Sequence, residues 1–264
     1  MQQYLSLLAD ILNNGADRED RTGVGTRGVF GRQLKIDLSA GFPLLTTKRL
    51  SIKSLVYDLL WMIRGETNIK FLNDHGVHIW DPWADESGDV GPVYGRQWRA
   101  WPDQNGQPID QLQNIISEIK SDPNSRRLVV SAWNVSELQR MAVPPCPTLF
   151  QFFVSNGRLS CHLYQRSADA FVGLPFNIAQ FSLLTCMVAQ ITGLERGEFI
   201  HSFGDVHLYQ PHIKLAKLQL ERKPMNLPQL VLNRSVQNIS HFTFGDINFE
   251  NYSAHPHIKA DVAV

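Results

Sequence analysis

The spacing of apolar residues predicts helices at several places along the 264-residue chain. The clearest is "SIKSLVYDLLWMIRG", in which apolar side chains recur every three or four residues up to Gly65, where the helix is expected to end. The N-terminal stretch up to Gly15 is amphipathic in the same way, and Asp110 is placed to cap another helix. The predicted helices cover 2–14, 51–64, 68–75, 110–121, 175–192 and 206–221.

Segments rich in β-forming residues predict strands at 27–37, 127–133, 148–155, 158–165 and near 229–233. The stretch "TLFQFFVSNGRLSCHLYQ" predicts a hairpin, because Asn156 and Gly157 suit a two-residue type I′ turn. Helices and strands interleave without regular βαβ spacing, so we expect an α+β fold with a large mixed sheet flanked by helices. No repeat or linker-like stretch divides the chain, and we expect a single domain over 1–264.

The composition describes an ordinary soluble globular protein, with 43% hydrophobic and 19% charged residues. The 25 basic and 25 acidic residues balance, which gives no support to a nucleic-acid or membrane-surface role. No apolar run suggests a membrane span, and the N-terminus lacks the features of a secretory signal. Cys146, Cys161 and Cys186 are odd in number and widely spaced. This argues against a disulfide framework or a zinc site and for a reducing, cytoplasmic compartment.

One of these cysteines lies in an unusual sequence. "RMAVPPCPTLFQFF" places Cys146 after Pro144 and Pro145 and before Pro147. Proline fixes its own φ and restricts the residue before it, so Cys146 cannot lie inside a helix. Most free cysteines are small buried hydrophobic residues, and the other two fit that description. The constraint on Cys146 instead indicates a thiol held in one direction, as a nucleophile requires.

Arginines are the candidate partners of that thiol. "DPNSRRLVV" contains Arg126 and Arg127, "LYQRSAD" contains Arg166 and Ser167, and "EDRTGVGT" contains Arg21. A single arginine is most often a solvated surface charge, but a guanidinium beside a hydroxyl also suits a phosphate. Arg126 and Arg127 would face opposite sides of the strand predicted there, so in the simplest geometry they cannot share one site.

Polar side chains in two further segments have both a structural and a functional interpretation. In "GLPFNIAQFSLL", Asn177 follows Pro175 and could simply begin a helix, or its amide could bind the edge of a base. In "GDVHLYQ", His207 and Tyr209 could belong to a turn that enters a helix, or they could bind a ligand. Neither segment decides between these interpretations alone.

Aromatic residues are concentrated in "GVHIWDPWADESGDVGPVYGRQWRAW". This stretch contains Trp80, Trp83, Trp98, Trp101 and Tyr94 among many glycines and aspartates. Core aromatic residues normally lie in periodic elements, so this stretch indicates the wall of a site for a flat ligand.

Taken together, these motifs resemble the folate-dependent, cysteine-nucleophile thymidylate synthases. The similarity runs from Tyr4 to Val264 and includes "DRTGVGT", "FPLLTTKR", "RGETNI", "IWDPWADESGDVGPVYGRQWR", "DPNSRR", "SAWN", "PPC", "HLYQRSAD", "GLPFNIA", "GDVHLY" and "IKADVAV". Each motif is weak alone, but their number and order over the whole chain are specific. Asn177 points to a uracil base, because related deoxycytidylate hydroxymethylases carry aspartate there.

The resemblance implies reductive methylation of dUMP to dTMP, with 5,10-methylenetetrahydrofolate as the donor of carbon and hydride, no metal, and a homodimer packed through its sheets. Arg126 and Arg127 would reach into the partner's site, and the clustered arginines would lower the pKa of Cys146. The catalytic residues would be Cys146, Asp58, Tyr94, Asn177 and Arg166. The residues that bind dUMP would be Arg21, Arg126, Arg127, Arg166, Ser167, Asp169, Asn177, His207 and Tyr209. Those that bind folate would be Ser51, Ile79, Trp80, Val143, Asp169, Gly173 and Val264.

Two positions depart from the family pattern close to the expected chemistry. Asp58 stands where the family usually has glutamate, and Pro147 where it usually has histidine. The shorter acid would be withdrawn by roughly 1.5 Å, and misplacement on that scale can slow a reaction about 100-fold. Two alternatives therefore stay open, a dUMP hydroxymethylase and a weakened homologue that binds nucleotide or folate. Ser51 and Asp261 are smaller departures, near the expected folate tail and the C-terminal lid.

Overall fold

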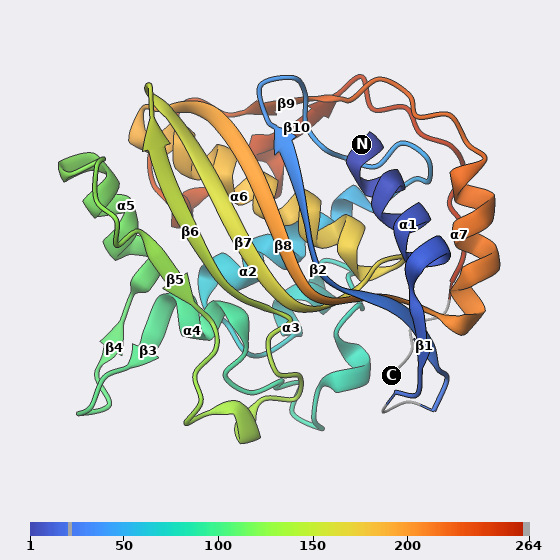
Figure 1. Ribbon diagram of the computed structural model, residues 1–264. Coiled ribbons are helices and arrows are strands. Elements are labelled where there is room, and N and C mark those ends of the chain that lie inside the picture. The colour runs from blue at the N-terminus through green and yellow to red at the C-terminus, as the bar shows by residue number, and fades with distance from the viewer. Residues whose placement is uncertain (21–22, 261–264) are drawn as a thin grey trace.

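The computed structural model describes residues 1–20 and 23–260 of the chain. A six-stranded mixed sheet crosses its centre in the order β1-β2-β8-β7-β6-β5 (Figure 1). β7 and β8 are parallel and every other neighbouring pair is antiparallel, which confirms the mixed sheet. The strands are β1 (Ala16–Arg18), β2 (Thr26–Asp37), β5 (Val129–Ser131), β6 (Pro147–Ser155), β7 (Arg158–Asp169) and β8 (Glu195–Tyr209). β3 (Trp101–Pro102) with β4 (Pro108–Ile109) and β9 (Gln229–Leu232) with β10 (Ile247–Glu250) form two small ribbons.

The helices are those that the apolar spacing predicts, with three exceptions. They are α1 (Gln2–Asn14), α2 (Ile52–Arg64), α3 (Lys70–Asp74), α4 (Tyr94–Ala100), α5 (Gln111–Ser121), α6 (Gly173–Thr192) and α7 (Ile213–Leu220). Gly65 ends α2 in the left-handed conformation, with φ 71°, and the Asp110 carboxylate caps α5 by accepting from Gln113 N. α3 is shorter than predicted, and α4 was not predicted.

The helix predicted at 206–221 is the main error. Residues up to Tyr209 belong to β8, a short 3-10 turn covers Gln210–His212, and α7 begins only at Ile213. The sequence did not predict β8 as a strand, because the spacing of its apolar residues does not distinguish it from the helix that follows. Its conformation is set by hydrogen bonds to β2 on one side and β7 on the other. The strand predicted at 127–133 is also shorter, so Arg126 and Arg127 precede β5.

The hairpin between β6 and β7 is confirmed. Its two turn residues, Asn156 and Gly157, have φ angles of 52° and 72°. Both are positive, as a type I′ turn requires, and this turn sets the register in which Ser155 lies opposite Arg158.

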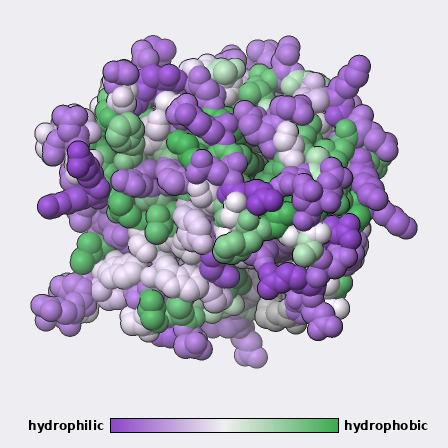
Figure 2. Space-filling model, viewed as in Figure 1, coloured by the Kyte–Doolittle hydropathy of each residue, from purple (hydrophilic) through white to green (hydrophobic). Residues whose placement is uncertain are grey.

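One face of the sheet is covered by helices and the other is open. α6 packs on β7 and β8, and in Figure 1 the strands lie in front of α6 and α2. α6 is long and apolar enough to cross a membrane, but nearly all of its side chains are buried in the core. The open face carries the side chains of Phe30 and Phe153, which are 76% and 62% exposed, and Figure 2 shows apolar and polar residues mixed on it.

Candidate active site

The topology of the sheet brings distant polar residues to one end of it. β7 and β8 run parallel, so their carboxyl ends lie side by side, and β6 begins there because it is antiparallel to β7. The facing residues at this end are Pro147 and Gln165, Ser167 and Asp205, and Asp169 and His207.

Cys146 immediately precedes β6, and both of its backbone polar groups form hydrogen bonds. Its backbone N–H donates to the hydroxyl of Tyr94 at 3.1 Å, and its carbonyl accepts from the amide of Arg166 at 2.9 Å. Pro145 and Pro147 are buried on either side, while Cys146 itself is only partly buried. The structure thus gives Cys146 the fixed backbone that its prolines predict.

The Arg166 side chain holds the segment that precedes Cys146 through hydrogen bonds to its backbone. Its Nε donates to the carbonyl of Pro145 at 3.0 Å, and its Nη2 donates to that of Pro144 at 2.7 Å. The guanidinium also lies 5.3 Å from the ring of Trp133. The Nη1 group makes no hydrogen bond within the described residues, so Arg166 can hold the segment before Cys146 and still bind an anion.

The pKa of Cys146 departs from our expectation. Burial raises the pKa of the thiol, and the charge of Arg166 and a hydrogen bond with Tyr94 only partly oppose that rise. In this chain alone the pKa of the thiol is therefore raised, although Arg166 acts in the expected direction. The reason is that taking the thiolate out of water outweighs the attraction of one guanidinium.

Tyr94 reaches Cys146 from the first position of α4, where its backbone is unusual. Its φ is +26°, a region that residues other than glycine rarely adopt. The next residue, Gly95, lies so close to α2 that an added Cβ would be 2.1 Å from the carbonyl oxygen of Met62. Tyr94 is buried and its ring packs edge-on against Trp80, with 5.9 Å between centroids. Burial raises the pKa of its hydroxyl well above the usual value.

Asp58 fixes the indole of Trp80. One carboxylate oxygen accepts from Trp80 Nε1 at 2.8 Å, and the other accepts from Gln180 Nε2 at 2.6 Å. Burial raises the pKa of Asp58 from 3.8 to about 6, although both hydrogen bonds oppose the change. Asp58 thus contacts Trp80 directly. Trp80 packs against Tyr94, and the Tyr94 hydroxyl accepts from the backbone of Cys146, so a continuous series of contacts joins Asp58 to Cys146.

Asn177 is joined by a hydrogen bond to β7 at the end of the sheet where Cys146 lies. Its Oδ1 accepts from Gln165 Nε2 at 3.0 Å, and Gln165 lies opposite Pro147 in the sheet. Asn177 belongs to the first turns of α6, as its structural interpretation predicts, and its functional interpretation stays a prediction.

His207 is oriented by a carboxylate on its own strand. Its Nδ1 lies 2.8 Å from Asp205 Oδ1, and the second oxygen of Asp205 accepts from Arg18 at 2.9 Å. The hydrogen bond with His207 lowers the pKa of Asp205, so the carboxylate is ionised and Nδ1 of His207 carries the proton. With this proton on Nδ1, Nε2 is the ring nitrogen that can accept. Tyr209 lies edge-on to His207, with 5.3 Å between the ring centroids.

Asp169 and a lysine that the sequence analysis missed meet at the start of α6. Oδ1 of Asp169 accepts from the backbone N–H groups of Phe171 and Val172 at 2.9 and 3.2 Å, and within the described residues Oδ2 has no such partner. Lys48 is buried, donates to the carbonyl of Phe171 and lies 3.5 Å over its ring. Burial lowers the pKa of Lys48 to about 7, against the attraction of Asp169. Its sequence signal was its place in the motif "FPLLTTKR".

Arg126 and Arg127 lie far from Cys146 of the same chain. Continued beyond β5, the register of the β5–β6 pair sets Arg127 opposite Phe153. Phe153 is seven residues from Cys146 along β6, which at about 3.3 Å per residue is roughly 23 Å. Both arginines are exposed, and neither forms an ion pair with a described acidic residue. At this distance we do not expect either arginine to contact a ligand at Cys146 of its own chain.

The remaining predicted residues do not join this cluster by hydrogen bonds within the described part of the chain. The Ser51 hydroxyl caps α2 by accepting from Ser54 N at 3.2 Å, Gly173 begins α6, Ile79 is exposed and Val143 is partly buried. Arg21, Asp261 and Val264 lie outside the described residues. Across 1–20 and 23–260, no three His, Cys, Asp or Glu side chains are grouped as metal ligands.

Comparison with known families adds a match over nearly the whole chain. The family model described as thymidylate synthase matches residues 2–264.

Proposed function

The chain belongs to the thymidylate synthase family, methyltransferases that act on dUMP, and we propose that it converts dUMP to dTMP through a covalent bond to Cys146. The observation that carries this proposal is the position of Cys146. Its backbone is held by Tyr94 and Arg166 at the end of the sheet where Gln165, the residue next to Arg166, binds the amide of Asn177. The co-substrate would be 5,10-methylenetetrahydrofolate, which supplies both the carbon and the hydride and leaves as dihydrofolate.

The first chemical step is addition of the Cys146 thiolate to C6 of uracil. The new S–C6 bond moves the C5=C6 electron pair towards O4 and makes C5 nucleophilic. Asn177 supports this step by donating from Nδ2 to O4, where the negative charge develops. The charge of Arg166 favours the thiolate, in opposition to burial. Tyr94, whose hydroxyl stays protonated because its pKa is raised, would assist removal of the C5 proton through a water.

The rest of dUMP would be bound along the ends of β7 and β8. Arg166 would offer its Nη1 edge, and Ser167 its hydroxyl, to the phosphate. His207, with its proton held on Nδ1 by Asp205, would accept from the ribose 3′-hydroxyl through Nε2. Tyr209 would bind the same hydroxyl. The remaining residues proposed to contact dUMP are Arg21 and Asp169.

The folate would lie on the indole of Trp80, which Asp58 holds in place. A fixed indole suits the stacking of a flat pterin because its orientation is set before binding. The unengaged Oδ2 of Asp169 would accept from the pterin. The other residues proposed to contact folate are Ser51, Ile79, Val143, Gly173 and Val264. The contact between Asp58 and Trp80 gives no reason to prefer the hydroxymethylase or the weakened homologue.

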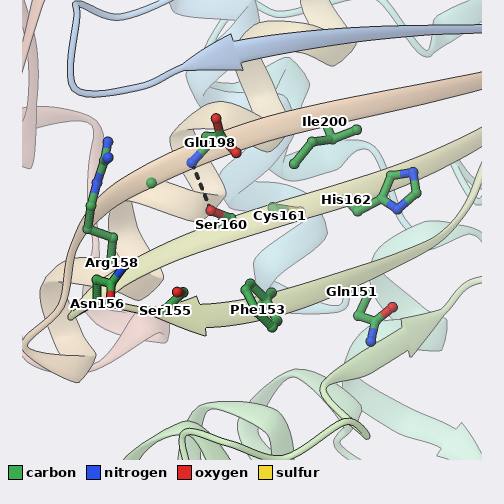
Figure 3. Close-up of a pocket in the computed structure, with 11 residues that line it drawn as sticks. Gln151, Phe153, Ser155, Asn156, Arg158, Ser160, Cys161, His162, Glu198 and Ile200 are labelled. Atoms are coloured by element: carbon green, nitrogen blue, oxygen red, sulfur yellow. Dashed lines mark hydrogen bonds between the residues drawn. The ribbon is translucent and has the colours of Figure 1, made fainter.

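We also propose a homodimer that buries the open face of the sheet. Phe30 and Phe153 are largely exposed there, and exposed apolar faces of this kind usually mark interfaces. Near the β6–β7 hairpin the face is hollowed, with a volume of about 560 Å³, and Figure 3 shows Phe153, His162 and Ile200 lining it from three strands. Arg126 and Arg127 flank this face and would complete the phosphate site of the other subunit. The free cysteines suit the reducing cytoplasm, where we place the enzyme.

A turnover assay tests the proposed function. The purified protein is mixed with dUMP and methylenetetrahydrofolate, dihydrofolate is followed by absorbance, and the nucleotide product is identified by mass spectrometry. We expect dihydrofolate and dTMP in equal amounts. In Cys146→Ser, turnover should fall at least about 1,000-fold while dUMP still binds, since binding rests on other residues. A hydroxymethylated product, or turnover that survives in Cys146→Ser, would contradict the proposal.

A further inference from the structure

A histidine that the proposed chemistry does not use lies beneath the residues that would contact the nucleotide. His201, on β8, is fully buried, and its ring packs against Phe203 with 4.1 Å between centroids. Its Nε2 lies 2.9 Å from Oε1 of Gln165. Its Nδ1 is buried and has no hydrogen-bond partner within the described residues.

The protonation of His201 follows from these contacts. The carbonyl oxygen of an amide carries no hydrogen, so Nε2 of His201 must be the donor. Burial lowers the pKa of the ring well below its usual value, and the charge of His162 lowers it further, so the ring is neutral. A neutral ring with its proton on Nε2 leaves Nδ1 as an acceptor, so the ring has no N–H group that is buried without a partner in the described residues.

The orientation of the Gln165 amide is determined by its neighbours. Its Nε2 lies 2.9 Å from the backbone carbonyl of Ser167, which can only accept, and 3.0 Å from Oδ1 of Asn177. Both N–H groups are therefore used, and Oε1 must point to His201. Gln165 is 2% exposed, so water does not satisfy these groups. One buried amide thus links His201 with two residues proposed to contact dUMP.

The same logic fixes Asn177. Gln165 presents a donor to it, so Asn177 must present Oδ1, which leaves Nδ2 for a ligand. In this orientation Nδ2 can donate to O4 of uracil, and the second lone pair of Oδ1 can accept from N3–H. Cytosine has a donor where uracil has O4 and an acceptor at N3, so it needs the amide turned over. Turning Asn177 over would set its N–H groups against those of Gln165, a repulsive arrangement.

We propose that His201 is a positioning residue that sets the base specificity of the site: by donating to Gln165, it holds the Asn177 amide in the orientation that binds uracil and rejects cytosine. This inference rests on the proposed function, since it assumes that Asn177 binds the base. A residue of similar size without a donor would fill the space beside Phe203 but would leave Oε1 of Gln165 buried and unpaired. The side chain of Gln165 could then leave its position and release Asn177.

Three variants of the full-length protein separate this role from simple packing. His201→Phe removes the donor and keeps the ring. His201→Gln restores an N–H that can reach Oε1 of Gln165. Phe199→Leu, the matched control, disturbs a ring whose centroid lies 5.4 Å from that of His201 but leaves the hydrogen bonds intact. For each protein, the Kd values of dUMP and dCMP are measured by calorimetry and the Tm by circular dichroism.

We expect the preference for dUMP over dCMP to fall about tenfold in His201→Phe and to stay within about threefold of wild type in His201→Gln. Phe199→Leu should lower the Tm and leave the preference unchanged. The inference is overturned if His201→Phe keeps the wild-type preference, or if Phe199→Leu reduces it as much. Failure of wild type to bind dUMP would instead overturn the proposed function.

A measurement on the wild-type protein does not depend on the folding of any variant. With ¹⁵N-labelled histidine, long-range ¹H–¹⁵N spectra report which ring nitrogen carries the proton. We expect His201 to be neutral with its proton on Nε2 throughout about pH 5 to 9. A proton on Nδ1 would remove the donor to Gln165 and overturn the inference.

Discussion

Replacement of Asp58 with asparagine should remove a pH-dependent destabilisation from the folded protein. The two side chains have the same shape, and the new amide could still accept from Trp80 Nε1 through its oxygen. Its nitrogen would face Gln180, whose own amide would turn over to accept in place of donating. The packing around Trp80 should therefore survive, and only the charge at this position is lost.

The magnitude follows from the pKa of Asp58, which burial raises from 3.8 to about 6. The folded chain holds this proton more tightly than the unfolded chain, so the stabilisation is complete below about pH 3.8 and is lost as the pH rises through about 6. A rise in pKa of this size corresponds to about 3 kcal/mol. Between about pH 4 and pH 7.5, the free energy of unfolding of the wild type should fall by roughly 2.5 kcal/mol relative to that of Asp58→Asn.

Urea unfolding at several pH values, followed by circular dichroism at one protein concentration, measures this difference. Asp10→Asn is the matched control with the opposite sign. Hydrogen bonds from Arg32 and Asn14 lower the pKa of Asp10. The free energy of unfolding of wild type should therefore increase relative to that of Asp10→Asn as the pH rises through the acid range. If the stabilities of wild type and Asp58→Asn change in parallel with pH, the carboxyl is not perturbed by burial and the reasoning fails.

Two further predictions concern the dimer and the position of α4. Arg126→Ala and Cys146→Ser should each be nearly inactive, but unfolding and refolding the two together should restore up to about a quarter of wild-type activity, because half of the mixed dimers form and each has one intact site. No recovery in the refolded mixture would place Arg126 in the site of its own chain. Gly95→Ala should destabilise the protein by at least about 2 kcal/mol in urea unfolding, since its Cβ would lie 2.1 Å from the carbonyl oxygen of Met62. Wild-type stability of that variant would contradict the close approach of α4 to α2.

The sequence by itself determined the features that depend on a few neighbouring residues. The end of α2 at Gly65, the cap of α5 at Asp110 and the turn at Asn156 and Gly157 all follow from local steric limits and local hydrogen bonds. The fixed backbone of Cys146 belongs to the same class, because the prolines around it restrict φ and ψ wherever the chain lies. These effects act within a few bonds, so they can be predicted before the fold is known.

Only the tertiary structure decided which residues meet and how much water they keep. β8 became a strand because β2 and β7 supply its hydrogen bonds, and this pairing brought His207 opposite Asp169. The hydrogen bond between His201 and Gln165 joins residues 36 positions apart, and that between Lys48 and the Phe171 carbonyl joins residues 123 apart. The opposite shifts that burial imposes on the pKa values of acids and bases, upward for Cys146 and Asp58 and downward for Lys48, depend on side chains from the whole chain. Desolvation is a property of the assembled core, and no local pattern of residues encodes it.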